Sequence, residues 1–488
     1  MTDGLPDPAA FGAAFEDFMH AMTGAAERPE TALAARIREH LGTDPAALPT
    51  TAAEFATTDH PNLQLAFDAV LPDAEVIGYA LSHGGFVPVS LANVLGGHGM
   101  TGPIREGPVQ EVAIEVGDGR VVQCVAAGMY LARHDDAPVV LLISRGERPF
   151  GASTLKVEGT SPDPDAVAAL LAALRAAMRE HNVYRGKVIS LHQREDRGVS
   201  VQFHRPQPVA RDAVILPEGT LERLERQAIG IAREADRLRA AGRHLKRGVL
   251  LHGPPGTGKT LSVTYLLGAM PGRTTVLLTG RGLGLIEEAL VIARELAPAT
   301  VVFEDVDLVA AERTMHIGAQ GVLFELLNQM EGIDEDADLL FVLTTNRADV
   351  IEPALAARPG RVDLALEIPL PDDAARRRLI RLYAAEIELD TATEDDLVAR
   401  TATVSGAFIK ELMRQAAVRA ALAGAAAPRA ADVKEALDEL LEERSTLTRR
   451  LLGQRTDGEA PAPPPFGPMM HALGAAGLPM PSDVEWPE

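Results

Sequence analysis

The chain has 488 residues with a formal net charge of −22, and 46% of its residues are apolar. This length suggests about three domains with sizeable cores. A surface this acidic is repelled by DNA and by anionic lipid, which argues against a nucleic-acid partner. Cys124 is the only cysteine in the sequence, so an intramolecular disulfide and a cysteine-cluster zinc site are both excluded.

Targeting segments are not visible in the sequence. Residues 1–8 lack the basic stretch and the apolar core of a signal peptide. No uncharged apolar run approaches the ~20 residues that a helix needs to span a bilayer. We therefore expect a cytoplasmic protein that has no membrane partner.

The first 206 residues predict two regions. Apolar side chains at helical spacing predict two short helices between residues 8 and 48, and we assign residues 1–56 to an N-terminal helical segment. Short apolar runs between turns predict an α/β domain at residues 57–206, with one helix at 163–181. Its histidines are scattered without metal-ligand spacing, and we interpret it as a module that recognises a protein client. The candidate strands are 75–80, 110–116, 121–129, 138–144, 188–192 and 199–204.

The next stretch contains a phosphate-binding loop. A charged helix, predicted from residue 220 to about 245, leads into the apolar run 248–251, and the pattern G-x-x-x-x-G-K-[ST] follows before another helix. Glycines allow backbone N–H groups to point at a phosphate, while the lysine reaches the β- and γ-phosphates and the hydroxyl ligates Mg²⁺. The nucleotide-binding candidates are Gly253, Pro254, Pro255, Gly256, Thr257, Gly258, Lys259, Thr260 and Leu261.

An acidic strand follows the loop. The apolar residues 300–303 are followed by Glu304 and Asp305, and Asp307 lies two residues further on. In parallel sheets that bind nucleotides, buried strands deliver carboxylates at their carboxyl ends to Mg²⁺ and to the attacking water. Glu304 and Asp305 are therefore candidates for catalysis and, with Thr260, for metal binding.

In this order the motifs resemble those of the AAA+ ATPases, especially the branch that contains Cdc48 and the proteasomal ATPases. Residues 341–347 resemble the sensor 1 strand, with Asn346 in the sensing position. Two arginines, Arg358 and Arg361, resemble those that reach the ATP of a neighbouring subunit. Near residue 405 the chain resembles the helix start that packs close to the nucleotide, which assigns Gly406 and Ala407 to nucleotide binding.

The resemblance implies a fold and an assembly. The fold class is α/β, with a P-loop NTPase (AAA+) parallel-sheet domain at residues 207–371 and an α-helical lid at 372–452, preceded by the separate α/β domain. The cofactors implied are ATP and Mg²⁺, and the implied assembly is a hexameric ring of identical subunits. Residues 453–488 are rich in Pro, Gly and Ala, which predicts a disordered tail.

Two departures from the family pattern qualify this prediction. Members carry Asp and then Glu at the acidic strand end, whereas this chain has Glu304 and then Asp305. An ungapped alignment puts Glu304 at the metal and makes Asp305 the general base, while the alternative register uses Asp305 for the metal and Asp307 as the base. The loop at residues 278–282 also lacks the aromatic residue with which peptide-threading members grip their substrate.

Two functions therefore remain open. The first is a ring-forming, ATP-hydrolysing remodeller of proteins with chaperone-like action, whose N-terminal domain selects the client. The second is a nucleotide-switched scaffold or regulator with slow ATP turnover. The sensor asparagine and the paired arginines favour the first function, whereas the altered acid pair and the non-aromatic loop favour the second.

Overall fold

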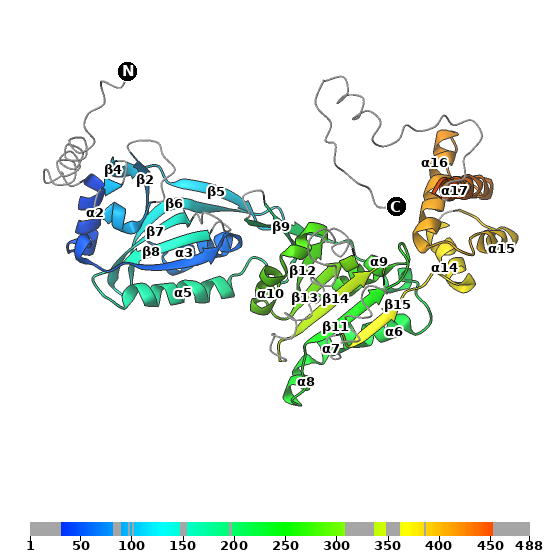
Figure 1. Cartoon of the computed structure of the whole chain (residues 1–488), viewed down its shortest axis with the longest axis horizontal. Coiled ribbons are helices and arrows are strands. Elements are labelled where there is room, and N and C mark those ends of the chain that lie inside the picture. Colours follow the sequence, from blue (N-terminus) through cyan, green and yellow to red (C-terminus); the bar gives the residue numbers. More distant parts are fainter. Residues whose placement is uncertain are drawn as a thin grey trace, which may run out of the picture. The chain divides into compact units, whose positions relative to one another are not determined.

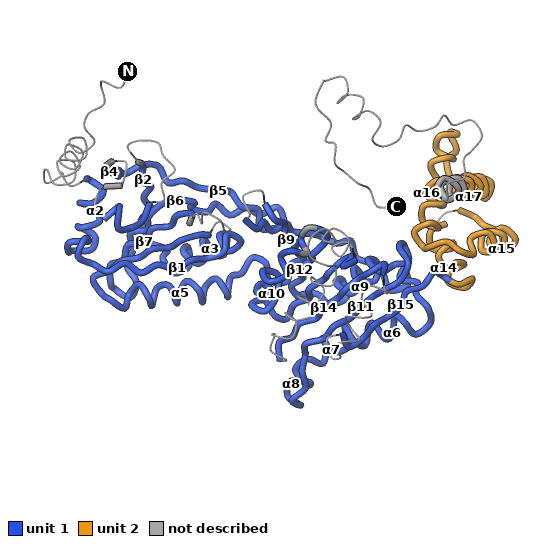
Figure 2. The backbone as a smooth tube through the Cα atoms, viewed as in Figure 1, with its two compact units in different colours: residues 1–371 blue, residues 372–488 orange. Residues whose placement is uncertain are grey.

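The computed structural model describes residues 31–81, 89–95, 98–99, 102–146, 154–194, 198–307, 336–347, 362–384 and 387–451. The chain divides into two compact units, residues 1–371 and 372–488 (Figure 2). Unit 1 contains two β-sheets, and the described part of unit 2 consists of helices (Figure 1). The second unit begins at the residue predicted to open the helical lid.

The first sheet is formed by the N-terminal half of unit 1. It has eight strands in the order β1-β8-β7-β6-β2-β4-β3, with β5 also paired to β6, and the pairs are antiparallel. The longest strand, β6, pairs with three neighbours and organises the sheet. The strands are β1 (Thr51–Ala56), β2 (Glu75–Leu81), β3 (His98–Gly99), β4 (Gly102–Gly107), β5 (Gln110–Glu115), β6 (Val121–His134), β7 (Ala137–Gly146) and β8 (Thr154–Thr160).

Helices cover both faces of this sheet. On β7, Leu141 packs into the same apolar cluster as α3 and α5, whereas Leu142 packs into the cluster of α2 and α4. Successive strand residues point to opposite faces, so an unbroken apolar run is buried on both sides. Phe67 of α3 stacks on Tyr130 of β6, with ring centroids 4.3 Å apart. The helices are α2 (Ala32–Leu41), α3 (His60–Val70), α4 (Leu91–Leu95) and α5 (Ala166–Glu180).

The helical segment predicted at residues 1–56 is not separate from this domain. In the structure α2 packs against the sheet, and β1 pairs with β8 as its edge strand. The other helix predicted in this segment lies outside the described residues. A short 3₁₀ helix, η1 (Pro45–Ala47), connects α2 to β1 where the sequence predicted a break.

The second sheet has seven strands in the order β10-β9-β12-β13-β14-β11-β15. The strands from β9 to β15 in this order run parallel, and β10 is antiparallel to β9. Helices flank both faces: Phe303 of β13 packs in the cluster of α10, and Val302 packs in the cluster of α6 and α9. The strands are β9 (Val188–Gln193), β10 (Val199–His204), β11 (Arg247–His252), β12 (Thr274–Thr279), β13 (Ala299–Glu304), β14 (Leu339–Thr345) and β15 (Leu364–Glu367).

The segment that was predicted as one helix before the phosphate loop is interrupted. Between α6 and α7 the chain forms one π-helical stretch, η4, before α8 completes the segment. The helices and short turns of this half of unit 1 are η3 (Arg211–Ala213), α6 (Thr220–Glu225), η4 (Arg226–Gly230), α7 (Ile231–Arg233), α8 (Ala235–Ala240), α9 (Lys259–Ala269), η5 (Gly280–Gly284) and α10 (Ile286–Glu295). The short turn η2 (Thr57–Asp59) belongs to the N-terminal half, where it connects β1 to α3.

The hairpin of β9 and β10 corrects one assignment. Both strands were predicted to belong to the N-terminal domain, but β9 pairs with β12 and extends the second sheet. Ile189 and Leu191 of β9 are buried in the cluster that also holds Phe303 and the apolar face of α10. The second sheet therefore reaches back to residue 188, ahead of the boundary predicted at residue 207.

The same hairpin is the contact surface between the two sheets of unit 1. The Tyr184 hydroxyl donates to the carbonyl of Thr58, and Asn62 Oδ1 accepts the Val183 N–H at 2.9 Å. Asp118 in the β5–β6 turn pairs with the basic residues that flank the hairpin, Lys187 and Arg205. Hydrogen bonds and ion pairs thus join the N-terminal domain to the residues that flank the hairpin.

Asp59 lies at this junction and makes the stability of the folded chain dependent on pH. Burial raises the pKa of the Asp59 carboxyl to about 6, and the charge of Glu295 adds to this, against a hydrogen bond from the Ala56 backbone. The folded state therefore binds a proton that the unfolded state releases near pH 4. The stability that this bound proton contributes to the folded state is complete below about pH 4 and is lost as the pH rises through about 6.

We therefore expect Asp59→Asn to be more stable than the parent chain at pH 8, by about 2 to 3 kcal/mol, and equally stable at pH 4. Denaturant unfolding at both pH values measures this difference. The exposed Asp336→Asn serves as a control for the loss of one carboxylate and should change stability little at either pH. A stability difference that is constant with pH would contradict the assignment.

A buried charge cluster fixes the amino ends of three strands of the second sheet. Asp338 accepts from Arg247 Nη1 and from Arg273 Nη1, each at 2.9 Å. All three side chains are less than a tenth exposed. Burial alone would raise the pKa of Asp338, but the hydrogen bonds and charges of Arg273 and Arg247 outweigh it and lower the pKa.

Asp338→Asn is expected to destabilise unit 1 by about 3–5 kcal/mol, because it leaves two buried guanidinium groups without their counter-charge. The midpoint of thermal unfolding, compared with that of Asp336→Asn, measures the effect. An unchanged midpoint would mean that water reaches these arginines and that the cluster contributes no stability.

Unit 2 consists of helices in its described part: α14 (Asp373–Ala384), α15 (Thr391–Arg400), α16 (Gly406–Leu422) and α17 (Ala430–Leu451). The side chains of Asp390 and Ser405 accept backbone N–H groups at the starts of α15 and α16, as N-cap residues do. Ile380, Leu397 and Leu412 from three of these helices are buried. Within the described ranges, no helix is both long and apolar enough to cross a membrane.

Candidate nucleotide site

The phosphate loop follows β11 and curls around the ammonium group of its own lysine. Lys259 Nζ donates to the carbonyl oxygens of Gly253 and Pro254, both at 2.8 Å, and the side chain is buried. Gly253 has φ +144°, and a Cβ there would lie 2.1 Å from the carbonyl oxygen of Ile368. Only glycine fits this position, so the turn can pass close to β15 and direct the chain into α9.

The lysine lies within the electric field of the acidic strand end. Burial lowers the pKa of the Lys259 ammonium, and the charges of Asp305 and Asp307 act in the opposite direction. The carboxyl ends of β11, β13 and β14 meet at one edge of the second sheet, because these strands run parallel. The fold thus brings together the loop and the acidic residues that the sequence predicted to share a site.

Glu304, the last residue of β13, contacts the hydroxyl of the phosphate loop. Burial raises the pKa of the Glu304 carboxyl and the nearby charge of Asp305 adds to this, against a hydrogen bond from the Thr260 side chain. A hydroxyl and a carboxylate side by side are hard oxygen ligands of the kind that Mg²⁺ accepts alongside phosphate oxygens. These two side chains therefore fit a magnesium ion bound together with a nucleotide.

Asp305 follows in a left-handed backbone conformation, with φ +50°. Its N–H donates to Thr344 Oγ1 at 3.0 Å, and its carboxylate accepts from Asn346 Nδ2 at 3.1 Å. A non-glycine residue with positive φ is strained and persists where surrounding contacts hold it. The strand alternation is thereby broken after Glu304, and the Asp305 side chain is held at the end of β14.

Asp307 is occupied by a different set of contacts. Its Oδ1 accepts the Thr345 hydroxyl at 2.9 Å and the Asn346 backbone N–H at 3.0 Å. These bonds tie the residues after β13 to the turn after β14. Thr344 and Thr345, whose hydroxyls contact Asp305 and Asp307, were not among the residues predicted for this site. The sequence does place two adjacent hydroxyl side chains at the end of a buried strand, which could have suggested them.

Four candidate residues have no determined position relative to this edge. Arg358 and Arg361 lie outside the described residues. Gly406 and Ala407 open helix α16, and the Ser405 side chain accepts the N–H of Phe408 at that helix start. Gly406 and Ala407 belong to the second compact unit, residues 372–488, whereas the phosphate loop belongs to the first.

Comparison with known proteins supports the interpretation of this edge. Residues 249–370 match the family model described as "ATPase family associated with various cellular activities (AAA)". The chain is 31% identical over 287 residues to ATP-dependent zinc metalloprotease FtsH 3 of Sphaerobacter thermophilus, which covers 56% of this chain and 58% of that protein.

Two further relatives carry proteasomal names. The chain is 34% identical over 229 residues to a 26S proteasome regulatory subunit 6B homolog of Encephalitozoon cuniculi, covering 44% of this chain and 58% of that protein. It is 37% identical over 193 residues to the homolog of Aspergillus niger, covering 36% and 44%. The chain spans about half the length of the curated relatives it matches. The predicted P-loop fold and the predicted family are confirmed for residues 249–370, the part of the chain that matches the AAA ATPase model.

Proposed function

We propose that this protein is a ring-forming, Mg²⁺-dependent ATPase that remodels protein clients in the cytoplasm, with a hexamer as its working assembly. The observation that carries the proposal is a pair of contacts at one sheet edge. The Thr260 hydroxyl meets Glu304, and Asn346 meets Asp305. Together they supply a metal position and a polarised carboxylate next to a phosphate loop.

In this proposal the phosphate loop and Lys259 bind the β- and γ-phosphates, and Thr260 with Glu304 holds the metal ion. Bound Mg²⁺ would neutralise charge on the phosphates. Leu261 lies in the first turn of α9, whose amino end faces the loop, and contributes through its backbone. Gly406 and Ala407 would line the nucleotide from the lid.

Asp305 is the proposed general base, and Asn346 positions it. The hydrogen bond from Asn346 Nδ2 fixes one carboxylate oxygen, so that the other can accept a proton from the attacking water. Asp307 instead uses its Oδ1 for two hydrogen bonds that tie it to the end of β14, and it is Glu304 that contacts the Thr260 hydroxyl proposed as a metal ligand. The contacts thus support the ungapped register over the alternative, in which Asp305 binds the metal.

The test is ATP turnover as a function of protein concentration, with and without Mg²⁺. We expect phosphate release to require Mg²⁺ and to rise more steeply than in proportion to concentration, because arginines from neighbouring subunits complete the site only in an assembly. Turnover per subunit that stays constant from the monomeric range upwards would contradict a shared site.

A nucleotide-switched scaffold with slow turnover is the second candidate. It is favoured by the aspartate at the base position, which is one methylene shorter than glutamate, and by the non-aromatic residues 278–282. ATP-dependent assembly with negligible phosphate release would support it.

Capture of clients by an Asp305→Asn variant, with a chain lacking residues 1–181 as control, tests whether the N-terminal domain selects the client.

A further inference from the structure

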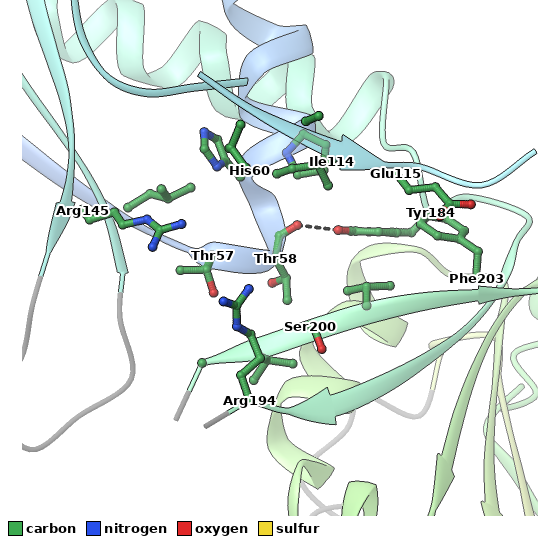
Figure 3. Close-up of a pocket in the computed structure, with 17 residues that line it drawn as sticks. Thr57, Thr58, His60, Ile114, Glu115, Arg145, Tyr184, Arg194, Ser200 and Phe203 are labelled. Atoms are coloured by element: carbon green, nitrogen blue, oxygen red, sulfur yellow. Dashed lines mark hydrogen bonds between the residues drawn. The ribbon is translucent and has the colours of Figure 1, made fainter. Parts of the chain in front are cut away.

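A cavity of about 300 Å³ lies at the junction between the N-terminal domain and the β9–β10 hairpin, away from the phosphate loop (Figure 3). This volume is at the lower end of the range of ~300–1,000 Å³ that is typical of small-molecule sites. One wall comes from η2, β5, β7 and β8 of the first sheet, and the other comes from the hairpin of the second. The cavity therefore exists only where the two sheets of unit 1 meet.

One end of the cavity is basic. Arg145 near the end of β7 and Arg194 just after β9 both line it, and Figure 3 shows their guanidinium groups extending toward Thr57 from two sides. Burial lowers the pKa of the His60 imidazole, and the charge of Arg145 lowers it further, which agrees with a guanidinium near the His60 side of the cavity, although Arg145 and Arg194 are both also exposed to solvent. In a chain with a net charge of −22, two arginines converging on one cavity mark it as a site for an anion.

The rest of the cavity is largely apolar. Aliphatic side chains from both sheets line it: Val112, Ile114, Leu155, Val199 and Val201. The acidic lining residue, Glu115, lies beside Tyr184 at the side away from Arg145 (Figure 3). A ligand that fits this distribution carries its negative charge at one end and an apolar body at the other.

We propose that this cavity binds a small organic anion, an apolar body that ends in a carboxylate or a phosphate, with the anionic group held between Arg145 and Arg194. Guanidinium groups bind both kinds of group through paired charge-assisted hydrogen bonds, and the Thr57 hydroxyl adds a neutral donor. The two arginines belong to different sheets, so the bound anion bridges the N-terminal domain and the ATPase sheet.

Isothermal titration calorimetry of the full chain tests the proposal, with benzoate and phenyl phosphate as probes and the neutral benzamide as control. We expect saturable binding of at least one anion and none of benzamide. The tighter anion identifies whether the site prefers carboxylate or phosphate. Arg145→Gln and Arg194→Gln should each weaken binding by about tenfold or more.

Arg237→Gln is the matched control, because Arg237 is exposed on α8 and pairs with Glu234 away from the cavity. It should leave the affinity unchanged. Thr57→Val removes one hydroxyl at constant shape and should weaken binding even if an arginine variant unfolds. No saturable binding of either anion, equal binding of benzamide, or affinities unaffected by the cavity variants would overturn the proposal. The titration needs no ATP, so its failure would leave the proposed ATPase function untouched.

Discussion

Asp305→Asn is expected to lower the rate of ATP turnover by about 10²–10⁴-fold while ATP still binds, because general-base catalysis typically contributes that much. The substitution keeps the shape of the side chain, and the amide oxygen can still accept from Asn346 Nδ2. It removes the group that can take a proton from water. Phosphate release under saturating ATP, together with the affinity for a fluorescent nucleotide, measures both parts of the prediction.

Asp307→Asn is the matched control for the register of the acidic strand. Its amide oxygen can accept the same two hydrogen bonds from Thr345 and Asn346, so turnover and thermal stability should change little. If Asp307 were the base, this variant would lose turnover at an unchanged unfolding midpoint and Asp305→Asn would lose metal binding instead. That pair of results would reinstate the alternative register.

The choice between the two registers shows which parts of the site can be predicted from the sequence alone. The phosphate loop is local in sequence, so its residues and their roles could be predicted without the fold. Which carboxylate faces Thr260 depends on where β13 ends, and the left-handed backbone at Asp305 ends the strand alternation after Glu304. A positive φ is common at glycine and uncommon at aspartate, so the sequence does not predict this backbone conformation at Asp305.

The parallel sheet around the phosphate loop could also be predicted from local sequence patterns, whereas the β9–β10 hairpin at its edge could not. The strands around the phosphate loop are long apolar runs separated by helices, which is the pattern of a parallel sheet covered on both faces. The β9–β10 hairpin has an alternating pattern that shows which face is buried but not which sheet it joins. The distant pairing of β9 with β12 decides that, and the junction cavity depends on it.

Arg361→Ala is expected to leave ATP binding and assembly intact while lowering turnover by about 10³–10⁵-fold, the contribution of an arginine that stabilises the transferred phosphoryl group. Arg361 lies outside the described residues, so the prediction rests on the sequence motif at residues 358–363. The matched binding-deficient variant is Lys259→Ala, which removes the ammonium group around which the phosphate loop curls.

Mixing the two variants decides whether the arginine acts on a neighbouring subunit. Each variant alone is expected to be inactive, because Lys259→Ala lacks the nucleotide and Arg361→Ala lacks the finger. In a randomly mixed head-to-tail ring, about a quarter of the interfaces pair an intact phosphate loop with an intact arginine, so about a quarter of the turnover should return. Co-purification of two differently tagged variants verifies that mixed rings form. Mixed rings without recovered turnover would show that the arginine serves the ATP of its own subunit.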